Sequence, residues 1–569
     1  MAGSMQAASM HGNDSNAGGL RFDVVAGLTA AAVVLPKAMA YATVAGLPVQ
    51  VGLYTSLVPM AVYGLLGSSR VLSVSSTTTL AILTGAQLGA VVPDGDPTKL
   101  LAATATLTAL VGALLLLARL LRLGFVANFI SAPVLTGFKA GIGLVILLDQ
   151  APKLFGVHIT KQSFFADILS VVRALPEASL LTVAVAAATV IVLIGMELLK
   201  PHSPAPLIAV AGAIAASWIF HLGAQGVSTV GHIPQGLPSL TLPNLALALQ
   251  LLPGAFGIAL MSFTETIAAG RAFVRPRDPP INANRELVAT GAANLVGSLL
   301  GAMPGGGGTS QTGVVRAAGG RTQAASLVTA AAALATMLLF APLLGLLPNA
   351  TLAAIVIVYS IPLIQPAEFN AIRRVRRMEF GWAIVATIGV LIFGTLQGIV
   401  IAVILSLIGL ASQTFHPRIT VIGRKRGADV LRPLDPENPD DETFEGLLIL
   451  RPEGRLFFIN AQDVADQVTA HVGQHKPRVL ALDFSRVPDI EYSALQMLQE
   501  GEKGMTERGV TVWFVGLNPG ALEVIRRAGL ATLLGPDRLL FNARAAIERY
   551  TALNALSANA AGLVPDPKA

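Results

Sequence analysis

The sequence contains no cysteine, and only 13% of its 569 residues are charged. The absence of cysteine excludes disulfide bonds, thiolate metal sites and cysteine nucleophiles. With 53% hydrophobic residues and so few charges, the chain has the composition of a polytopic membrane protein that lies in a lipid bilayer. Its formal net charge of +6 does not indicate a nucleic-acid partner, because the Lys and Arg residues lie mainly in loops between apolar segments.

The stretch between residues 23 and 414 divides into fourteen apolar segments, many of them near the ~20 residues that a spanning helix needs. Fourteen Lys and Arg residues follow the even-numbered segments, and four follow the odd-numbered ones. Positively charged loops face the cytoplasm, so we expect a multi-pass protein of the cell's inner (plasma) membrane with both termini cytoplasmic. The even-numbered segments are followed by Arg70, Arg119, Arg122, Lys200, Arg271, Arg275, Arg277, Arg285, Arg316, Arg321, Arg373, Arg374, Arg376 and Arg377, and the odd-numbered ones by Lys99, Lys153, Lys161 and Arg173.

Two segments, the third (75–92) and the tenth (309–318), begin within stretches rich in glycine and hydroxyl residues, at 68–79 and 304–312. Irregular backbone at membrane depth is tolerated only where it lines a cavity, and paired broken helices mark a transport site. Their separation by seven segments predicts two inverted seven-segment repeats. Because half-helix N-termini carry positive dipole ends, we predict that they bind an anion. The candidate anion-binding residues there are Ser75, Ser76, Thr77, Thr309, Ser310 and Gln311.

Simpler interpretations of both stretches stay open. A run of four glycines at 305–308 is also typical of a flexible connector. The hydroxyl groups of residues 75–77 could bond to their own helix, as intramembrane Ser and Thr commonly do. The polar residues that directly follow the glycines favour a binding site over a connector.

Two ionisable residues, Lys37 and Glu265, lie deep in apolar surroundings. Charges in spanning helices are costly, so they usually face a partner or a wet cavity. Tyr41 lies one helical turn from Lys37 on the same face, and Pro36 loosens the helix beside them. We predict that Lys37 supplies positive charge for the anion and that Glu265 either pairs with it or binds the coupling ion. The alternatives are a snorkelling or structurally paired Lys37 and simple aromatic packing of Tyr41.

Seven short motifs occur along the membrane segments. They are residues 23–29 (DVVAGLT), 36–48 (PKAMAYATVAGLP), 52–54 (GLY), 67–70 (GSSR), 123–125 (LGF), 282–286 (NANRE) and 319–323 (GGRTQ). In order and spacing they resemble the SulP (sulfate permease) family of anion transporters, and the resemblance runs from about residue 21 to residue 550. It implies fourteen segments in two inverted repeats, a core domain that carries the anion, a gate domain against which it moves, and a homodimer.

The resemblance also implies where the anion binds. In the family the site lies between the third and tenth half-helices, with contributions from the first and eighth segments. This sequence differs from many relatives at two of these positions, with Lys37 where they have Gln and Gln311 where they have Arg. The fixed positive charge is thus expected on the first segment instead of the tenth. The matching residues are Lys37, Tyr41, Ser76, Thr77, Glu265, Thr309, Ser310 and Gln311.

After residue 415 the charged residues concentrate, and short apolar strands alternate with amphipathic helices. We predict strands at 446–451, 456–460, 479–485 and 510–516 and helices from about 493 and 520. This resembles a STAS domain, a module that also occurs in anti-sigma-factor antagonists. Those antagonists are phosphorylated on a Ser that directly follows an Asp. Here Glu491 and Tyr492 occupy those two positions, and Ser493 is a weak phosphorylation candidate. The expected domains are a disordered N-terminus (1–20), a transmembrane anion transporter domain (21–414), a linker (415–436), a STAS domain (437–550) and a disordered tail (551–569).

We therefore predict a secondary active transporter of a small inorganic or organic anion, of the sulfate, bicarbonate or carboxylate class, that works by alternating access. No ATP-binding glycine loop is present, so an ion gradient would drive transport, with a proton preferred over sodium as the coupling ion because of Glu265. An anion exchanger, an uncoupled anion channel and a STAS-based signalling protein are the alternatives. We expect no cofactor, no bound metal and no enzymatic activity.

Overall fold

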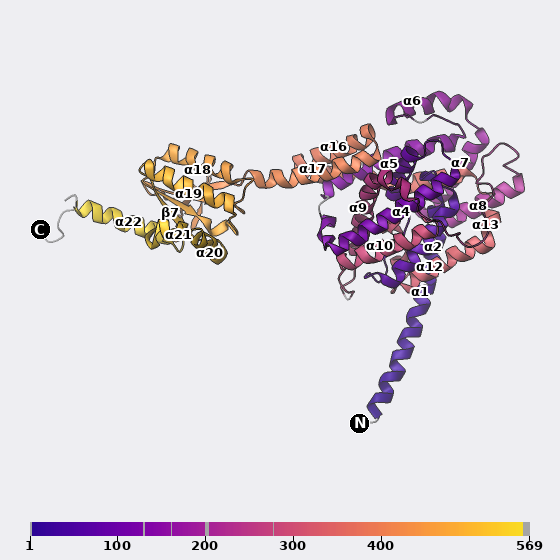
Figure 1. The fold of residues 1–569 in the computed structure, drawn as a ribbon, viewed down its shortest axis with the longest axis horizontal. Coiled ribbons are helices and arrows are strands. Elements are labelled where there is room, and N and C mark those ends of the chain that lie inside the picture. The colour runs from indigo at the N-terminus through magenta and orange to yellow at the C-terminus, as the bar shows by residue number, and fades with distance from the viewer. Residues whose placement is uncertain (1–2, 129–130, 161, 200–203, 277, 561–569) are drawn as a thin grey trace. The chain divides into compact units, whose positions relative to one another are not determined.

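The computed structural model describes residues 3–128, 131–160, 162–199, 204–276 and 278–560. The chain divides into two compact units, with the division between Leu407 and Ile408. Unit 1 is built almost entirely of helices, whereas unit 2 contains a six-stranded sheet with helices packed on it (Figure 1).

Unit 1 contains a first group of helices that pack mainly against one another. They are α1 (Gly3–Val44), α2 (Val49–Leu66), α3 (Thr78–Val91), α4 (Pro97–Leu120), α9 (Ala248–Ala272), α10 (Ala283–Leu299), α11 (Thr309–Ala317) and α12 (Ala324–Ala335). Helix α10 packs along α4 and α2, and α1 packs along α12 and α2. Helices from the two halves of the sequence are therefore interleaved in one body.

A second group packs around α5 and α14. It consists of α5 (Ala132–Phe155), α7 (Leu180–Leu199), α8 (Ala205–Phe220), α14 (Asn349–Ser360), α15 (Pro366–Val375) and α16 (Arg377–Phe393). The two groups meet mainly where α1 packs against α14 and α8. Further short helices, α6 (Phe164–Ala174) and α13 (Ala341–Leu344), join the longer ones, and α17 (Thr395–Phe415) runs through the division into unit 2.

Each of the fourteen predicted segments overlaps a helix, and the fifth is displaced at both ends. The sequence predicts this segment at 125–149, whereas α5 occupies Ala132–Phe155. Pro133 in the first turn and the left-handed Gly156 after the last turn explain the observed ends, because proline favours helix starts and glycine favours helix ends. The apolar residues before α5 instead form a short 3-10 helix, Leu123–Asn128.

Among the described residues, eight helices are long and apolar enough to cross a bilayer, and three shorter helices are strongly apolar. The longest apolar stretches carry large side chains that face outward, among them Leu180 and Leu199 of α7 and Leu249 of α9. An apolar exterior of this kind fits a protein surrounded by lipid, since no apolar partner covers these residues within the described chain. The fold is thus that of a helical membrane protein with two interleaved halves.

The ends of the chain are helical as far as the structure describes them. Helix α1 begins at Gly3 and so continues through most of residues 1–20, of which residues 1 and 2 lie outside the described part. At the other end, α22 (Ala543–Ala560) enters the predicted tail, and residues 561–569 lie outside the described part.

Unit 2 contains a mixed sheet with the order β4-β3-β5-β6-β7-β8. Strands β5 to β8 are parallel, and β3 joins β5 antiparallel, so β3 and β4 form a hairpin on one edge. This hairpin lies within residues 415–436, which the sequence predicts as a linker. The strands are β3 (Ile419–Arg424), β4 (Leu431–Pro433), β5 (Leu447–Pro452), β6 (Val479–Asp483), β7 (Thr511–Val515) and β8 (Leu539–Leu540).

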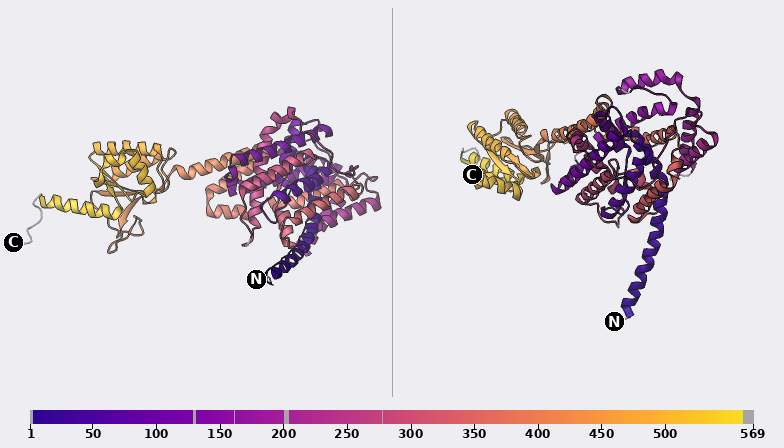
Figure 2. Two further views of the ribbon diagram at one scale, coloured as in Figure 1. Left: turned by 60° about the horizontal axis from the view of Figure 1, so that its bottom comes forward. Right: turned by 45° about the vertical axis from the view of Figure 1, so that its right-hand side comes forward.

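Helices cover both faces of this sheet (Figure 2). One face packs against α18 (Ala461–His475), α19 (Tyr492–Glu507), α20 (Pro519–Arg527) and α21 (Leu530–Leu534), which connect the parallel strands. The other face packs against α22, where Ile547 and Tyr550 contact Trp513 of β7. Right-handed connections between neighbouring parallel strands place α18 to α21 on one face, and α22, which follows β8, covers the other.

One predicted strand of unit 2 is wrong. Residues 456–460 form only a single bridge, between Leu456 and Ile490, and then turn into α18. The Asn460 side chain causes the turn, because its amide accepts from the Phe457 N–H at 3.0 Å and donates to the Arg455 carbonyl at 2.9 Å. An apolar run that ends in such a turn looks like a strand in sequence, since periodicity alone does not show the turn.

Candidate functional site

The two broken segments meet in the first group of helices. Strand β1 (Val74–Ser75) leads into α3 and strand β2 (Gly306–Gly307) leads into α11, and the two strands pair antiparallel. Val74 lies opposite Gly307, and Ser75 lies opposite Gly306. Backbone groups that would be costly at membrane depth therefore bond to each other, and the N-termini of both half-helices lie at one place. The sequence predicts this meeting but not its register.

The glycine run is a packed strand and not a flexible connector. A Cβ atom on Gly307 would lie 2.8 Å from Thr266 Cα, and one on Gly306 would lie 3.0 Å from Ser262 Oγ. Helix α9 also bonds to the run, because Ser262 Oγ donates to the Gly305 carbonyl at 2.8 Å and Gly307 N–H donates to Thr266 Oγ1 at 2.9 Å. Glycine is needed here because strand β2 lies directly against a helix backbone.

The N-terminus of α3 is capped by Thr77, which also contacts Glu265. Thr77 Oγ1 accepts from the Leu80 N–H at 3.3 Å and donates to Glu265 Oε2 at 2.9 Å. Glu265 is half-buried on α9, the eighth predicted segment. A predicted anion-binding residue and the predicted coupling residue are thus directly hydrogen-bonded.

Ser75 and Gln311 tie the two half-helices together. Ser75 Oγ donates to Gln311 Oε1 at 2.8 Å, and Gln311 Nε2 donates to the Ser73 carbonyl at 3.1 Å. Both side chains are buried. These polar groups already have protein partners, so they hold the site in place more directly than they offer donors to a ligand.

Ser76 differs from its neighbour, because its buried hydroxyl has no hydrogen-bond partner among the described residues. A buried hydroxyl without a partner is costly and is rare unless a ligand or water completes it. Across the pair of strands, Thr309 and Ser310 in the first turn of α11 are exposed. The preceding Gly308 provides no side-chain cap, so the first N–H groups of α11 have no side-chain partner there.

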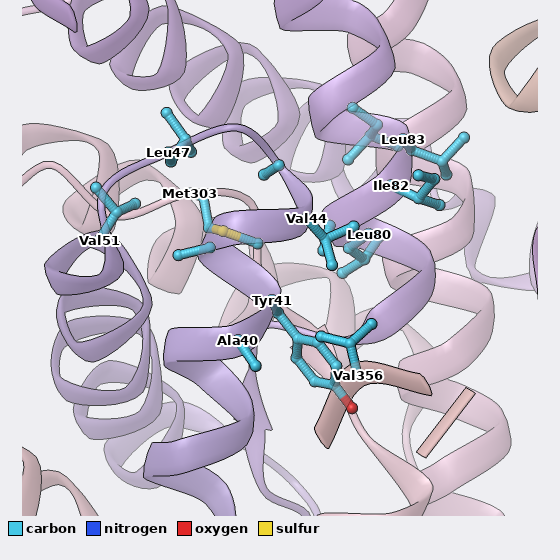
Figure 3. Packing of buried hydrophobic residues seen from close by; sticks show 14 of the residues in the cluster. Ala40, Tyr41, Val44, Leu47, Val51, Leu80, Ile82, Leu83, Met303 and Val356 are labelled. Atoms are coloured by element: carbon cyan, nitrogen blue, oxygen red, sulfur yellow. The ribbon is translucent and has the colours of Figure 1, made fainter. Parts of the chain in front are cut away.

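Lys37 and Tyr41 are buried on α1 next to the half-helices. Figure 3 shows Tyr41 beside Val356 of α14, so this part of α1 faces the second group of helices. In the described chain no ion pair or hydrogen bond reaches Nζ of Lys37, and none joins Lys37 to Glu265. Nζ instead lies 3.4 Å from the centroid of the Tyr359 ring, also on α14.

Sequence reasoning missed Tyr359. It lies in the run Ile355-Val-Ile-Val-Tyr-Ser360, where nothing in the spacing separates a ligand-facing aromatic from a packed one. Glu286 was also missed as a structural residue, although it ends the motif at 282–286. Its fully buried carboxylate accepts from Tyr63 Oη at 2.7 Å and from the Ser68 N–H at 2.9 Å. Glu286 thereby fixes the start of the stretch that leads to β1.

The C-terminal end of α11 is held by a hydrogen bond and an ion pair of Arg316. Arg316, in its last turn, donates to the Phe273 carbonyl at 2.6 Å and forms an ion pair with Asp278 in the loop after α9. Burial alone would raise the pKa of Asp278, but hydrogen bonds from the Arg275 N–H and from Arg316 outweigh it and hold the pKa below its usual value. A cation also suits this position because the C-terminal end of a helix carries partial negative charge.

Comparison with known proteins identifies the fold. Residues 20–386 match the sulfate permease family, and residues 438–545 match the STAS domain. A probable sulfate transporter of Mycobacterium tuberculosis is 34% identical over 536 residues, which cover 93% of this chain and 95% of that protein. Sulfate transporter 1.2 of Arabidopsis thaliana is 29% identical over 93% of this chain and 85% of its own length.

Solved structures share the architecture. The murine Slc26a9 anion transporter in its inward-facing state matches with a TM-score of 0.87 and 22% identity, over 93% of this chain and 91% of the other. The transmembrane domain of the cyanobacterial bicarbonate transporter BicA matches with a TM-score of 0.57 and 24% identity, over 68% of this chain and 97% of the other. The resemblance stated from the motifs is therefore confirmed. The chain belongs to the sulfate permease family of membrane transporters and carries a C-terminal STAS domain.

Proposed function

We propose that this protein is a secondary active transporter that binds a small anion between the N-termini of α3 and α11. One observation carries the proposal: the pairing of β1 with β2 brings two positive helix ends together, and α1, which carries the buried Lys37, packs against both half-helices. Helix N-termini and an ammonium group both favour an anion, and Ser76 adds a buried donor without a partner. Lys37, Ser76 and the first N–H groups of α11 then bind the anion, while Ser75 and Gln311 hold the half-helices in place.

The class of anion follows from the same groups and from the relatives. A single lysine with hydroxyl and N–H donors suits sulfate, bicarbonate or a small carboxylate, with a lean toward a monovalent anion or one carried with a proton. The named relatives are sulfate transporters, and one similar structure is of a bicarbonate transporter. We propose a homodimer in the cell's inner (plasma) membrane with both termini cytoplasmic, as the charge distribution of the loops predicts.

The bond between Thr77 and Glu265 suggests how a proton couples to the anion. When Glu265 is ionised, its carboxylate accepts a hydrogen bond from the Thr77 hydroxyl. Its negative charge then lies near the site and disfavours binding of an anion. When Glu265 is protonated, that negative charge is gone and the Thr77 hydroxyl is free to donate to the anion. The anion therefore binds best together with a proton, which is the requirement for symport. Sodium in place of the proton, exchange without a coupling ion and channel conduction are the outcomes that the test must separate.

The coupling is tested by uptake of radiolabelled sulfate, bicarbonate and fumarate into proteoliposomes, with and without an inward proton gradient. Wild type should accumulate one of the anions in response to the gradient. Glu265→Gln should lose that response while it still exchanges internal for external anion, and the exposed Glu177→Gln serves as the matched control. A normal gradient response in Glu265→Gln would show that the proton is carried elsewhere.

The location of the site is tested by thiol protection. Because the chain has no cysteine, Ser310→Cys introduces the only thiol, on the exposed first turn of α11. The transported anion should slow its reaction with a thiol reagent, and Lys37→Gln should remove that protection. Protection that persists in Lys37→Gln would mean that the anion binds without this lysine.

A further inference from the structure

We propose that Tyr359 is the partner that holds Lys37 when no anion is bound, so that the two residues form a latch between the two groups of helices. This inference rests on the proposed function, because it describes what the binding lysine does in the empty site. The contact itself is direct: Nζ of Lys37 lies 3.4 Å from the centroid of the Tyr359 ring.

The ring is a suitable partner for this lysine. The face of an aromatic ring carries negative potential, and a cation over it is held more strongly when water is excluded. Lys37 is only 5% exposed, and among the described residues no ion pair or hydrogen bond reaches its ammonium group. The carboxylate of Glu197 on α7 acts on this charge electrostatically without forming an ion pair with it. The Tyr359 ring is therefore the group in direct contact with this charge, and together with Glu197 it offsets the cost of burying it. Losing the ring leaves the buried cation without its contact partner and with only the longer-range charge of Glu197.

The contact lies where movement is expected. Lys37 belongs to α1 in the first group, which contains both half-helices, and Tyr359 belongs to α14 in the second group. If the first group carries the anion past the second, the ring cannot stay over Nζ throughout the cycle. The stack therefore favours the arrangement of the two groups that the structure shows and opposes the other arrangement.

An anion and the ring compete for the same ammonium group. An anion bound to Nζ supplies full negative charge, so the ring is no longer needed to offset the lysine, and its negative face would repel an anion placed against it. Binding of the anion therefore weakens the latch and allows the first group to move. By linkage, the latch in turn weakens anion binding in the arrangement that the structure shows. Tyr359 is thus a positioning residue that makes movement depend on occupancy.

The test measures the arrangement of the two groups without measuring transport. Ser310→Cys is reacted with a membrane-impermeant thiol reagent added to sealed proteoliposomes from one side or from the other. The ratio of the two rates reports the fraction of molecules open to each side. Tyr359→Leu, which removes the ring, should change this ratio by roughly three- to thirtyfold toward the other side, whereas Tyr359→Phe keeps the ring face and should leave it unchanged.

Addition of sulfate, bicarbonate or fumarate should move the ratio in wild type and have a smaller effect in Tyr359→Leu. An unchanged ratio in Tyr359→Leu would overturn the latch, and a wild-type ratio that none of the three anions moves would overturn its release by anion. Equal rates from both sides in wild type would mean that neither arrangement is favoured and would also overturn the latch. Absence of anion uptake by wild-type proteoliposomes would instead overturn the proposed function, which separates its failure from failure of the latch alone.

Discussion

The two half-helices begin in the same place but are built differently. Helix α3 starts with hydroxyl residues that are buried or half-buried, and its cap Thr77 bonds to both its own backbone and Glu265. Helix α11 starts after glycines, has no side-chain cap, and exposes Thr309 and Ser310. The comparison suggests a division of roles, in which α3 provides buried donors while α11 provides backbone N–H groups and access. Substitutions on each side test this division.

The largest effect is expected at the glycine run. Gly307→Ala places a Cβ atom 2.8 Å from Thr266 Cα, a contact that only a backbone shift relieves. Overpacking of this kind costs about 1–3 kcal/mol, and here it also displaces the α11 N-terminus. We expect lost uptake and a lower thermal unfolding temperature, measured in proteoliposomes and in detergent.

Gly305→Ala is the matched control for this substitution. Its Cβ atom would meet nothing closer than 3.4 Å, which is ordinary van der Waals contact. This variant should keep both stability and uptake near wild type. Equal stability of Gly307→Ala and wild type would show that β2 does not need its close approach to α9.

The second-largest effect concerns anion affinity, which should depend on the buried hydroxyl of Ser76 more than on the exposed hydroxyl of Ser310. If Ser76 Oγ donates to the anion, Ser76→Ala removes a hydrogen bond to a charged group worth about 1.5–3 kcal/mol, which weakens binding roughly 10- to 100-fold. The protein itself loses no bond, since this hydroxyl has no partner in the described structure. Ser310→Ala, on the exposed turn, should change affinity far less. Titration of both variants by calorimetry checks this order, and a larger loss in Ser310→Ala would reverse the division of roles.

A third and smaller effect concerns the cap that only α3 has. Thr77→Ala removes the side chain that accepts the Leu80 N–H, and loss of an N-cap costs about 1 kcal/mol of stability. Thr77→Ser keeps the hydroxyl and should restore both stability and the proton response of uptake. Chemical unfolding measures the first and gradient-driven uptake the second. A stable, proton-responsive Thr77→Ala would assign Thr77 no role in either.

The smallest effect lies at the C-terminal end of α11, where Arg316 and Asp278 form an ion pair that has no counterpart at α3 among the described residues. The pKa of Asp278 is lower in the folded protein than in the unfolded chain, so its contribution to stability is fully present above the unfolded pKa of about 3.9. This contribution is lost as pH falls through the folded value. Asp278→Asn should therefore be slightly less stable than wild type at pH 7, and the difference should shrink in acid. A difference that is constant down to pH 3 would mean that the charge of Asp278 does not matter.

The sequence predicted the positions of the two half-helices better than the contacts between them. Glycine and hydroxyl residues in short apolar segments marked both half-helices, and an isolated Lys37 marked the charged residue of α1. The register that pairs Val74 with Gly307 could not be predicted, because the two residues are far apart in sequence and the two repeats show no evident sequence similarity. The Tyr359 contact could not be predicted either, because it depends on how α14 packs against α1. Local patterns indicate which residues are unusual, whereas packing decides which of them meet.

The two-stranded pairing also has a consequence for how the protein is made. The backbone groups of residues 74 and 75 find their strand partners only at residues 306 and 307, more than two hundred residues later in the chain. Until the ribosome has produced β2, the first repeat holds a helix that starts at membrane depth with unpaired backbone groups, which lipid cannot satisfy. The first half therefore cannot reach its final packing alone, and α3 can take its final position only after β2 has been synthesised and has paired with β1. Chains truncated before residue 306 should be cleared by cellular quality control.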